Sequence, residues 1–211
     1  MKKKTTSENK LIKPDKIALE RTLPVGEPVL ATPVRPDWDQ LYITMCYLVG
    51  MRSRDEHTHV GSVIVDSDNV LVSTGYNSLP RKIESEPGGK RLSREGGEKY
   101  FWLEHAERNA IYNAARRGTV LKGCKIYIPW MPCADCARGI IQCGISEVIV
   151  HKNGEEFYNS NTSGQWVESH RRTMQMFDEA GVITRYVTCD VITPEIYMNA
   201  EIFNPEKSLN N

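Results

Sequence analysis

Two short motifs hold residues whose types and spacing could do chemistry: His105-x-Glu107 and Pro132-Cys133-x-x-Cys136. Cysteines three positions apart at a helix start lie on one face, and the positive end of the helix dipole favours the thiolate that binds zinc. With His105 as a third ligand, a tetrahedral zinc keeps its fourth position for water, which is the arrangement of catalytic sites. The metal would lower the pKa of that water to about 7. Glu107, which is not a ligand, would carry the protons.

Each motif has an ordinary explanation when it stands alone. A Cys-x-x-Cys pair also occurs as a structural zinc clip or a redox pair, and a structural zinc site closes with a fourth protein ligand. The remaining histidines are isolated or lie at a strand entrance; they are His57, His59, His151 and His170. Together, on two helix starts separated by one strand, the motifs match the H-x-E and P-C-x-x-C signature of the zinc nucleobase deaminases. The sequence therefore predicts a zinc-dependent hydrolytic deaminase with the ligands His105, Cys133 and Cys136.

The elements that must position these residues follow from hydrophobic periodicity, caps and turn residues. The first predicted helix is capped by Asp37. Further helices are predicted at 106–114, 133–142 and 167–180, and a C-terminal helix is predicted from Thr193. The predicted strands are 60–65, 70–76, 125–128, 147–150 and 182–186. A hairpin followed by alternating helices and strands predicts an α/β fold in three layers, with a mixed five-stranded sheet between helices. The polar stretch 78–99 and the segment before 167 are predicted as loops.

The first 36 residues differ in composition from the rest. They contain five of the eleven prolines, Pro14, Pro24, Pro28, Pro33 and Pro36. Prolines at this density exclude a regular helix or a central strand. We therefore predict an extended or flexible arm at 1–36 and a single deaminase domain at 37–211. A solvated linker, an arm that packs on a neighbouring subunit and a nucleic-acid-binding tail are all compatible with this composition.

The bulk composition narrows the class of protein. The 27 basic and 27 acidic side chains balance, whereas proteins that bind nucleic acid usually carry a basic surface. No apolar run approaches the roughly 20 residues that span a bilayer, and the basic start of the chain is not followed by an apolar signal segment. We therefore expect a cytoplasmic protein whose six cysteines are thiols and ligands, with no disulfide framework.

Three segments between Trp38 and Val187 resemble the deoxycytidylate (dCMP) deaminase branch of the cytidine deaminase-like superfamily. Arg52–Gly61 is similar to R-S-K-D-P-x-[ST]-x-V-G, Gly75–Pro80 to G-Y-N-G-x-P, and His105–Ile111 to H-A-E-L-N-A-I. The resemblance implies the three-layer cytidine deaminase-like fold and one catalytic Zn²⁺ per chain. It also implies hydrolysis of dCMP to dUMP and ammonia.

The same resemblance implies which residues contact the nucleotide. Asn77 would hydrogen-bond the sugar or base, Arg54 and Thr58 would lie near the 5′-phosphate, and Ala106 belongs to the same substrate-binding set. An arginine fork and a hydroxyl suit a phosphate, although a solvated surface charge also explains Arg54. Trp130 is unusual for the branch and resembles the S-W-S-P-C motif of polynucleotide cytosine deaminases. It is either an aromatic wall against the pyrimidine or part of the core.

Departures from the branch leave the exact substrate open. Ser78 replaces a glycine, Glu56 a proline and His59 a glutamine, so dCMP, dCTP and a 5-modified deoxycytidine nucleotide all remain candidates. The alternative functions are a tRNA or single-stranded DNA base deaminase and a non-enzymatic zinc scaffold or nucleotide sensor.

The branch is often oligomeric and regulated by deoxynucleoside triphosphates. The resemblance therefore implies a homo-oligomer, from dimer to hexamer, and a dCTP or dTTP effector with Mg²⁺. The cation-rich loop 81–99 is either a site for effector phosphates or a solvated flap.

Overall fold

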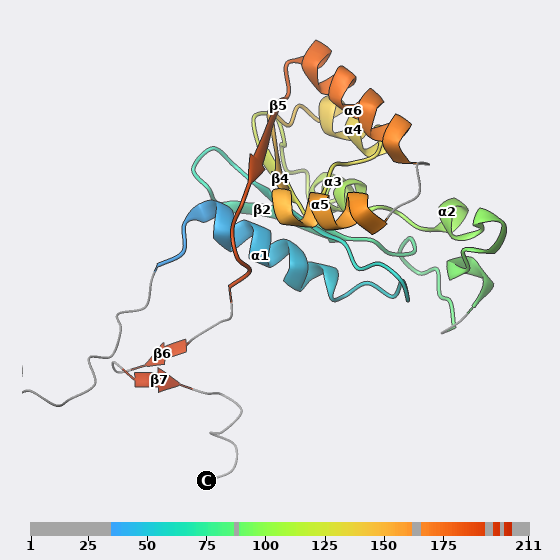
Figure 1. Cartoon of the computed structure of the whole chain (residues 1–211), viewed down its shortest axis with the longest axis horizontal. Coiled ribbons are helices and arrows are strands. Elements are labelled where there is room, and N and C mark those ends of the chain that lie inside the picture. Colours follow the sequence, from blue (N-terminus) through green and yellow to red (C-terminus); the bar gives the residue numbers. More distant parts are fainter. Residues whose placement is uncertain (1–34, 87–88, 162–165, 193–195, 199–200, 204–211) are drawn as a thin grey trace, which may run out of the picture. The chain divides into compact units, whose positions relative to one another are not determined.

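The computed structural model describes residues 35–86, 89–161, 166–192, 196–198 and 201–203 (Figure 1). Of the predicted arm at 1–36, only the last two residues fall within these ranges. The arm and its boundary with the deaminase domain therefore stay predictions. No helix in the described part of the chain is long and apolar enough to cross a membrane.

Five strands form the predicted mixed sheet: β1 (Gly61–Val65), β2 (Leu71–Tyr76), β3 (Lys125–Ile128), β4 (Glu147–His151) and β5 (Ile183–Val187). Their order in the sheet is β2-β1-β3-β4-β5. β1 is antiparallel to β2 and β3, with Val63 opposite Tyr127, whereas β3, β4 and β5 are parallel. The hairpin between β1 and β2 turns at Asp66, whose carboxylate accepts hydrogen bonds from the amides of Asp68 and Val70.

The described ranges hold these α-helices: α1 (Trp38–Gly50), α2 (Lys99–Trp102), α3 (Ala106–Ala115), α4 (Ala134–Gln142), α5 (Lys152–Asn161) and α6 (Val167–Ala180). α1, α3, α4 and α6 lie where the sequence predicts them. The predicted cap of α1 is present, because the Asp37 side chain accepts a 2.7 Å hydrogen bond from the Gln40 amide. α6 ends at Gly181, whose φ of 70° is a left-handed conformation that suits glycine.

Helices cover both faces of the sheet (Figure 1). On one face, Ile43 of α1 belongs to a buried cluster with Tyr127 of β3. On the other face, Ala110 of α3 and Ile140 of α4 belong to a second cluster with Ile126 of β3. Successive residues of a strand point to opposite faces, so neighbouring residues of β3 serve different layers. The predicted three-layer α/β/α fold is confirmed.

The apolar spacing that predicts α1 does not mark its buried side. Leu41, Met45 and Leu48 recur at helical spacing, but none is buried and Leu48 is 51% exposed. The buried side of the helix instead carries Ile43 and Cys46. Periodicity therefore identifies this helix correctly without identifying the face that meets the sheet.

Two segments predicted as loops contain helices. The stretch 78–99 includes two short 3-10 helices, Lys90–Leu92 and Glu95–Gly97, and the segment after β4 forms α5. Glycine, asparagine and serine are poor helix formers, so the composition of α5 hides it from a propensity argument. Gly154 is there for packing, because a Cβ atom at this position would lie 2.3 Å from the Pro129 carbonyl oxygen.

The predicted C-terminal helix is wrong for the residues that the structure describes. β6 (Ile196–Met198) pairs antiparallel with β7 (Glu201–Phe203), so that Ile196 lies opposite Phe203. The predicted cap, Thr193–Glu195, lies outside the described residues. β-branched and aromatic residues favour strands, and in this segment they outweigh the helix-start signal of a proline.

Helix α3 rests directly on the β1–β2 hairpin because Gly75 has no side chain. A Cβ atom at Gly75 would lie 2.2 Å from the Ala106 carbonyl oxygen and 2.3 Å from the Ala110 amide nitrogen. The hydroxyls of Ser62 and Ser73 donate hydrogen bonds to the carbonyls of Ala106 and Ala110 at 2.8 and 2.7 Å. These contacts fix the start of α3, which holds the first predicted ligand.

Candidate metal centre

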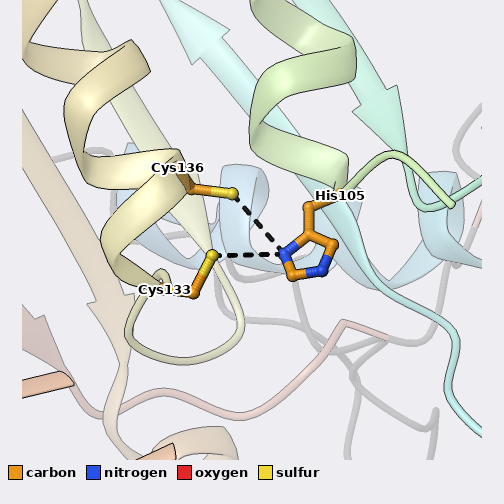
Figure 2. Close-up of side chains that lie close together, drawn as sticks. All are labelled: His105, Cys133 and Cys136. Atoms are coloured by element: carbon orange, nitrogen blue, oxygen red, sulfur yellow. Dashed lines mark hydrogen bonds between the residues drawn. The ribbon is translucent and has the colours of Figure 1, made fainter. Parts of the chain in front are cut away.

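The starts of α3 and α4 bring the three predicted ligands together (Figure 2). His105 and Cys133 are the N-cap residues of the two helices, and Cys136 lies in the first turn of α4. The Nδ1 atom of His105 lies 3.5 Å from the Sγ atom of each cysteine. All three ligand atoms lie within 4.8 Å of one another, and no other such group is found among the described residues. The arrangement could hold a metal ion.

Two helices on the far side of the site hold the loop that carries Cys133. Glu155 of α5 accepts a 2.6 Å hydrogen bond from the Met131 amide. Thr173 of α6 donates a 2.9 Å hydrogen bond to the Pro132 carbonyl. The helix that the sequence did not reveal therefore takes part in placing a metal ligand.

The cluster fits zinc in donor type and in spacing. Zinc binds thiolate sulfur at about 2.3 Å and imidazole nitrogen at about 2.0–2.1 Å, so tetrahedral geometry separates the two donors by about 3.6 Å. The 3.5 Å separations between His105 Nδ1 and the two Sγ atoms agree with that value. One imidazole and two thiolates make three protein ligands, which leaves a tetrahedral ion one position for water.

The hydrogen bond between the two thiols of the cluster shifts their pKa values in opposite directions. A hydrogen bond from the Cys136 thiol, and a further one from His105, lower the pKa of Cys133 to about 4. The same contact with Cys133, together with burial, raises the pKa of Cys136 well above its usual value. Burial works against the His105 cation, but Cys133 and Glu107 outweigh it and raise the pKa of His105. Negative charge is therefore already favoured at Cys133.

An arginine supports the second thiolate position. The Arg108 Nη1 atom lies 3.6 Å from Cys136 Sγ, and its Nε atom donates a 2.7 Å hydrogen bond to Glu104. Glu104 lies one helical turn before Arg108, and both side chains are largely covered, at 29% and 18% exposed. The guanidinium is thus held in place by a carboxylate and offset by it in charge, while it donates toward a ligand sulfur. Arg108 has no role among the predictions from the sequence.

Glu107 provides a buried carboxylate beside the cluster. It is 6% exposed and lies in the first turn of α3, two positions after His105. Burial raises its pKa, and the nearby His105 partly opposes that rise. A carboxyl group whose pKa is raised toward neutrality can both accept and return a proton, which is what general acid–base catalysis requires.

The predicted substrate residue Asn77 fixes a neighbouring loop. Its side chain is buried, its Oδ1 atom accepts a 2.9 Å hydrogen bond from the Val60 amide, and its Nδ2 atom donates a 2.8 Å hydrogen bond to the Thr58 carbonyl. An amide side chain has two donors and two acceptor positions, so one of each remains for a ligand. The Thr58 hydroxyl accepts a 3.2 Å hydrogen bond from Arg94.

Residues 36–152 match the family model for the cytidine and deoxycytidylate deaminase zinc-binding region. The chain belongs to this deaminase family. The match spans α1 to the end of β4 and includes all three residues of the metal cluster.

Individual relatives agree with the family. The chain is 33% identical over 151 residues to the deoxycytidylate deaminase of Pongo abelii, covering 71% of this chain and 79% of that protein. It is 35% identical over 155 residues to an uncharacterized deaminase of Aliivibrio fischeri, covering 74% and 97% of the two proteins. The match to the human deoxycytidylate deaminase covers 64% of that protein at 37% identity.

A solved structure shares the fold. The dCMP deaminase of cyanophage S-TIM5, crystallised with dCMP and dUMP, aligns with a TM-score of 0.56 and 19% identity. The alignment covers 74% of this chain and the whole of the phage chain. The phage enzyme supports the deaminase fold.

The other predicted substrate residues of this deaminase lie in three different settings. Arg54 is exposed and forms a 2.9 Å ion pair with Glu84, which is also exposed. Trp130 stacks on Tyr158 of α5, with ring centroids 4.9 Å apart and an angle of 9° between the ring planes. Ala106 is fully buried at the start of α3. Trp130 is partly exposed, so it is neither fully core nor a free surface side chain.

Besides Arg108, three residues near the site were not predicted from the sequence. Trp166, at the start of α6, has its ring centroid 6.3 Å from that of His105. Asp55 and Lys99 form a buried ion pair beside the predicted phosphate loop. Asp55 lies within the segment that resembles the dCMP deaminase branch, so its position was a signal without an assigned role. Lys99 is one cation among several in a polar stretch, and nothing in the sequence distinguishes it from its neighbours.

Proposed function

We propose that this chain hydrolyses dCMP to dUMP and ammonia, with His105, Cys133 and Cys136 as zinc ligands and Glu107 as the proton carrier. The observation that carries the proposal is the His–Cys–Cys cluster at two helix starts beside a buried carboxylate that is not part of the cluster. The choice of dCMP as the substrate rests on the deoxycytidylate deaminases among the relatives.

The chain's own residues divide the work of the reaction. Zinc, when bound, supplies the Lewis acidity that makes water a nucleophile near neutral pH. Glu107 takes a proton from the attacking water and delivers it to N3 of the cytosine ring as the carbon–oxygen bond forms at C4. It then takes the proton of the hydroxyl added at C4 and passes it to the exocyclic amine, so that the C4–N bond breaks, ammonia leaves and the uracil carbonyl forms. The covered position of Glu107 keeps the shuttled proton away from bulk water.

The substrate contacts belong to the same proposal. Asn77 uses its remaining hydrogen-bonding positions for the sugar, and Thr58 and Arg54 contact the 5′-phosphate. Arg54 would exchange its exposed partner Glu84 for the phosphate, since a bidentate arginine–phosphate pair is stronger than an exposed ion pair. Trp130, held by its stack on Tyr158, would form a wall of the base pocket. dCTP and 5-modified deoxycytidine nucleotides are the alternative substrates.

The finer properties implied by the resemblance complete the proposal. They are a homo-oligomer of two to six subunits, regulation by dCTP or dTTP with Mg²⁺, and a cytoplasmic location. Cys46, Cys124, Cys143 and Cys189 are free thiols and the other two cysteines belong to the metal cluster, which supports a reducing compartment. Of the cations in the loop 81–99, Lys99 is committed to Asp55, so effector phosphates would have to use the more exposed ones.

One assay tests the proposed function. The purified full chain is incubated with cytosine, deoxycytidine, dCMP and dCTP, and uracil formation is followed by absorbance alongside the zinc content. We expect one zinc per chain and the highest kcat/KM with dCMP. Zinc-loaded protein that releases no ammonia from any of the four compounds would overturn the enzyme assignment, and a preference for dCTP would overturn the substrate.

A further inference from the structure

The ion pair between Lys99 and Asp55 is almost completely removed from water. The Lys99 Nζ atom lies 2.5 Å from Asp55 Oδ2, and the side chains are 6% and 1% exposed. Burial has the largest single effect and raises the pKa of Asp55. The hydrogen bond and charge of Lys99 and the hydrogen bonds from the amides of His57 and Thr58 together outweigh burial, and they leave that pKa below its usual value. A buried ion pair is weak evidence for stability, because desolvation offsets much of the attraction, whereas fixing one geometry is its better-attested role.

Asp55 organises the loop that follows α1. Its Oδ1 atom accepts hydrogen bonds from the amides of His57 and Thr58 at 2.9 and 3.3 Å, while Oδ2 accepts from Lys99. Its own amide donates a 3.1 Å hydrogen bond to the Ser53 hydroxyl. The carboxylate therefore sets the conformation of residues 53–58, and Lys99 sets the position of the carboxylate.

The same loop is hydrogen-bonded to Asn77, the residue that follows β2. Thr58 accepts from the Asn77 side chain, and the Ser53 hydroxyl donates to the Asn77 carbonyl at 2.9 Å. The next residue, Ser78, exchanges two backbone hydrogen bonds with Glu104 at 3.0 and 2.9 Å. Glu104 directly precedes His105 in the sequence. A continuous hydrogen-bonded path therefore connects the Lys99–Asp55 pair with the first metal ligand.

Lys99 is the last residue of the polar stretch 78–99. It is the first residue of α2, and its amide is held by the Ser93 carbonyl at 2.9 Å. Arg94, from the same stretch, donates to the Thr58 hydroxyl at 3.2 Å. The segment 93–99 therefore contacts the 53–58 loop twice, through the buried pair of Lys99 with Asp55 and the exposed hydrogen bond from Arg94 to Thr58.

We propose that Lys99 and Asp55 are positioning residues that hold the 53–58 loop in the geometry that receives the 5′-phosphate of the substrate. The inference rests on the proposed function, because that function places the phosphate at Arg54 and Thr58. Neither Lys99 nor Asp55 needs to touch the substrate. The pair determines where the Thr58 hydroxyl and the 54–58 backbone lie relative to His105, and hence how well one ligand spans both ends of the site.

Steady-state kinetics with dCMP separate positioning from folding. Lys99→Met should raise KM for dCMP by about tenfold or more, with a change in kcat of less than about threefold, as expected when a lost interaction serves binding. A variant that merely folded less well would lose kcat at constant KM. Zinc content should stay at the wild-type value, because the cluster lies at the other end of the path. Lys122→Met, which removes an exposed lysine between α3 and β3, is the matched control and should change neither constant.

A double variant covers the case in which Lys99→Met alone leaves Asp55 charged and buried and the protein poorly folded. Asp55→Asn with Lys99→Met removes both charges and should fold, while still raising KM. Competitive inhibition gives a further readout: Ki for dUMP should rise in these variants, and Ki for deoxyuridine, which has no phosphate, should not. An unchanged KM, or an equal rise in both Ki values, would overturn the inference. Absence of dCMP turnover by the wild type would instead overturn the proposed function.

Discussion

At single residues, the proposed reaction depends on a division of roles between the metal ligands and the proton carrier. The ligand atoms of His105, Cys133 and Cys136 lie together, whereas Glu107 is buried nearby and is not in the metal-binding group. A carboxylate that coordinated the ion could not move protons freely. The residue types at these four positions were readable from the sequence, because chemistry restricts them so strongly.

Glu107→Gln should keep the zinc and lose the reaction. Glutamine has nearly the shape of glutamate but cannot carry a proton, so turnover of dCMP should fall by about 10²-fold or more. Zinc content by atomic absorption and ammonia release measured on the same preparation check both halves. Near-normal turnover in the zinc-loaded variant would contradict the assigned role.

Arg108→Leu should weaken zinc binding without removing a ligand. The guanidinium lies 3.6 Å from Cys136 Sγ, and loss of such an outer contact typically lowers metal affinity by about 10–100-fold. A chromophoric chelator competing for zinc measures the change. Arg138→Leu, on the exposed side of α4 and paired with Asp135, is the control and should bind zinc as the wild type does. Equal affinities for all three proteins would show that Arg108 has no part in the site.

At the level of helices and strands, hydrophobic periodicity predicted where the elements lie in the sequence, but for α1 it did not predict which face is buried. The five strands of the main sheet and four of the helices were predicted within a residue or two of their observed bounds. α5 was missed because glycine and asparagine, which it contains, are also typical of turns. The close packing of Gly154 against Pro129 is a tertiary contact that the local sequence does not indicate. The two strands at 196–203 were missed because a proline start signal was weighted above β-branched content.

Gly75→Ala should destabilise the protein by displacing α3. The new Cβ atom would meet the backbone of Ala106 and Ala110 at 2.2 and 2.3 Å, and backbone cannot move aside as a side chain can. Overpacking of this kind costs about 1–3 kcal/mol. Gly139→Ala is the control, because its Cβ would make ordinary contacts with the side chains of Ile111 at 3.5 Å and Arg108 at 3.9 Å and alanine is favoured in a helix by about 1 kcal/mol. Urea unfolding should move the two midpoints in opposite directions, and a stabilised Gly75→Ala would contradict the packing argument.

For the whole molecule, the order of the elements predicted the fold class, but it did not predict the hydrogen bonds and ion pairs between residues that are far apart in the sequence. Asp39 in α1 accepts a 3.0 Å hydrogen bond from Nη2 of Arg185 in β5, 146 positions later. Arg185 also binds Glu147 of β4 at 2.8 Å, and Tyr127 of β3 donates to Asp39 at 2.9 Å. One arginine therefore connects three elements, and the sequence contains no local pattern for such a contact. The buried pair of Lys99 and Asp55 escaped prediction for the same reason.

Arg185→Met should lower stability in a pH-dependent way. Hydrogen bonding to Arg185 lowers the pKa of Asp39 in the folded state, so the contribution of this carboxylate is present above its unfolded pKa of about 3.9 and is lost as the pH falls through the folded value. Because the network is partly exposed, we expect a loss of about 1–2 kcal/mol at pH 7. The difference from the wild type in urea unfolding should shrink below about pH 4.

Arg171→Met serves as the control for that measurement, since it breaks an exposed pair with Glu168 on α6. It should leave the unfolding midpoint unchanged at either pH. A difference between wild type and Arg185→Met that stays constant from pH 7 down to pH 3 would contradict the role given to Asp39.

A crystal structure of the zinc-loaded protein with dUMP would test the assigned zinc ligands and proton carrier directly. We expect one ion bound by His105 Nδ1 and the two sulfurs, with its fourth position facing C4 of the pyrimidine and the Glu107 carboxylate within hydrogen-bonding distance of N3. A fourth protein side chain on the ion, or a Glu107 carboxylate directed away from the base, would contradict the account.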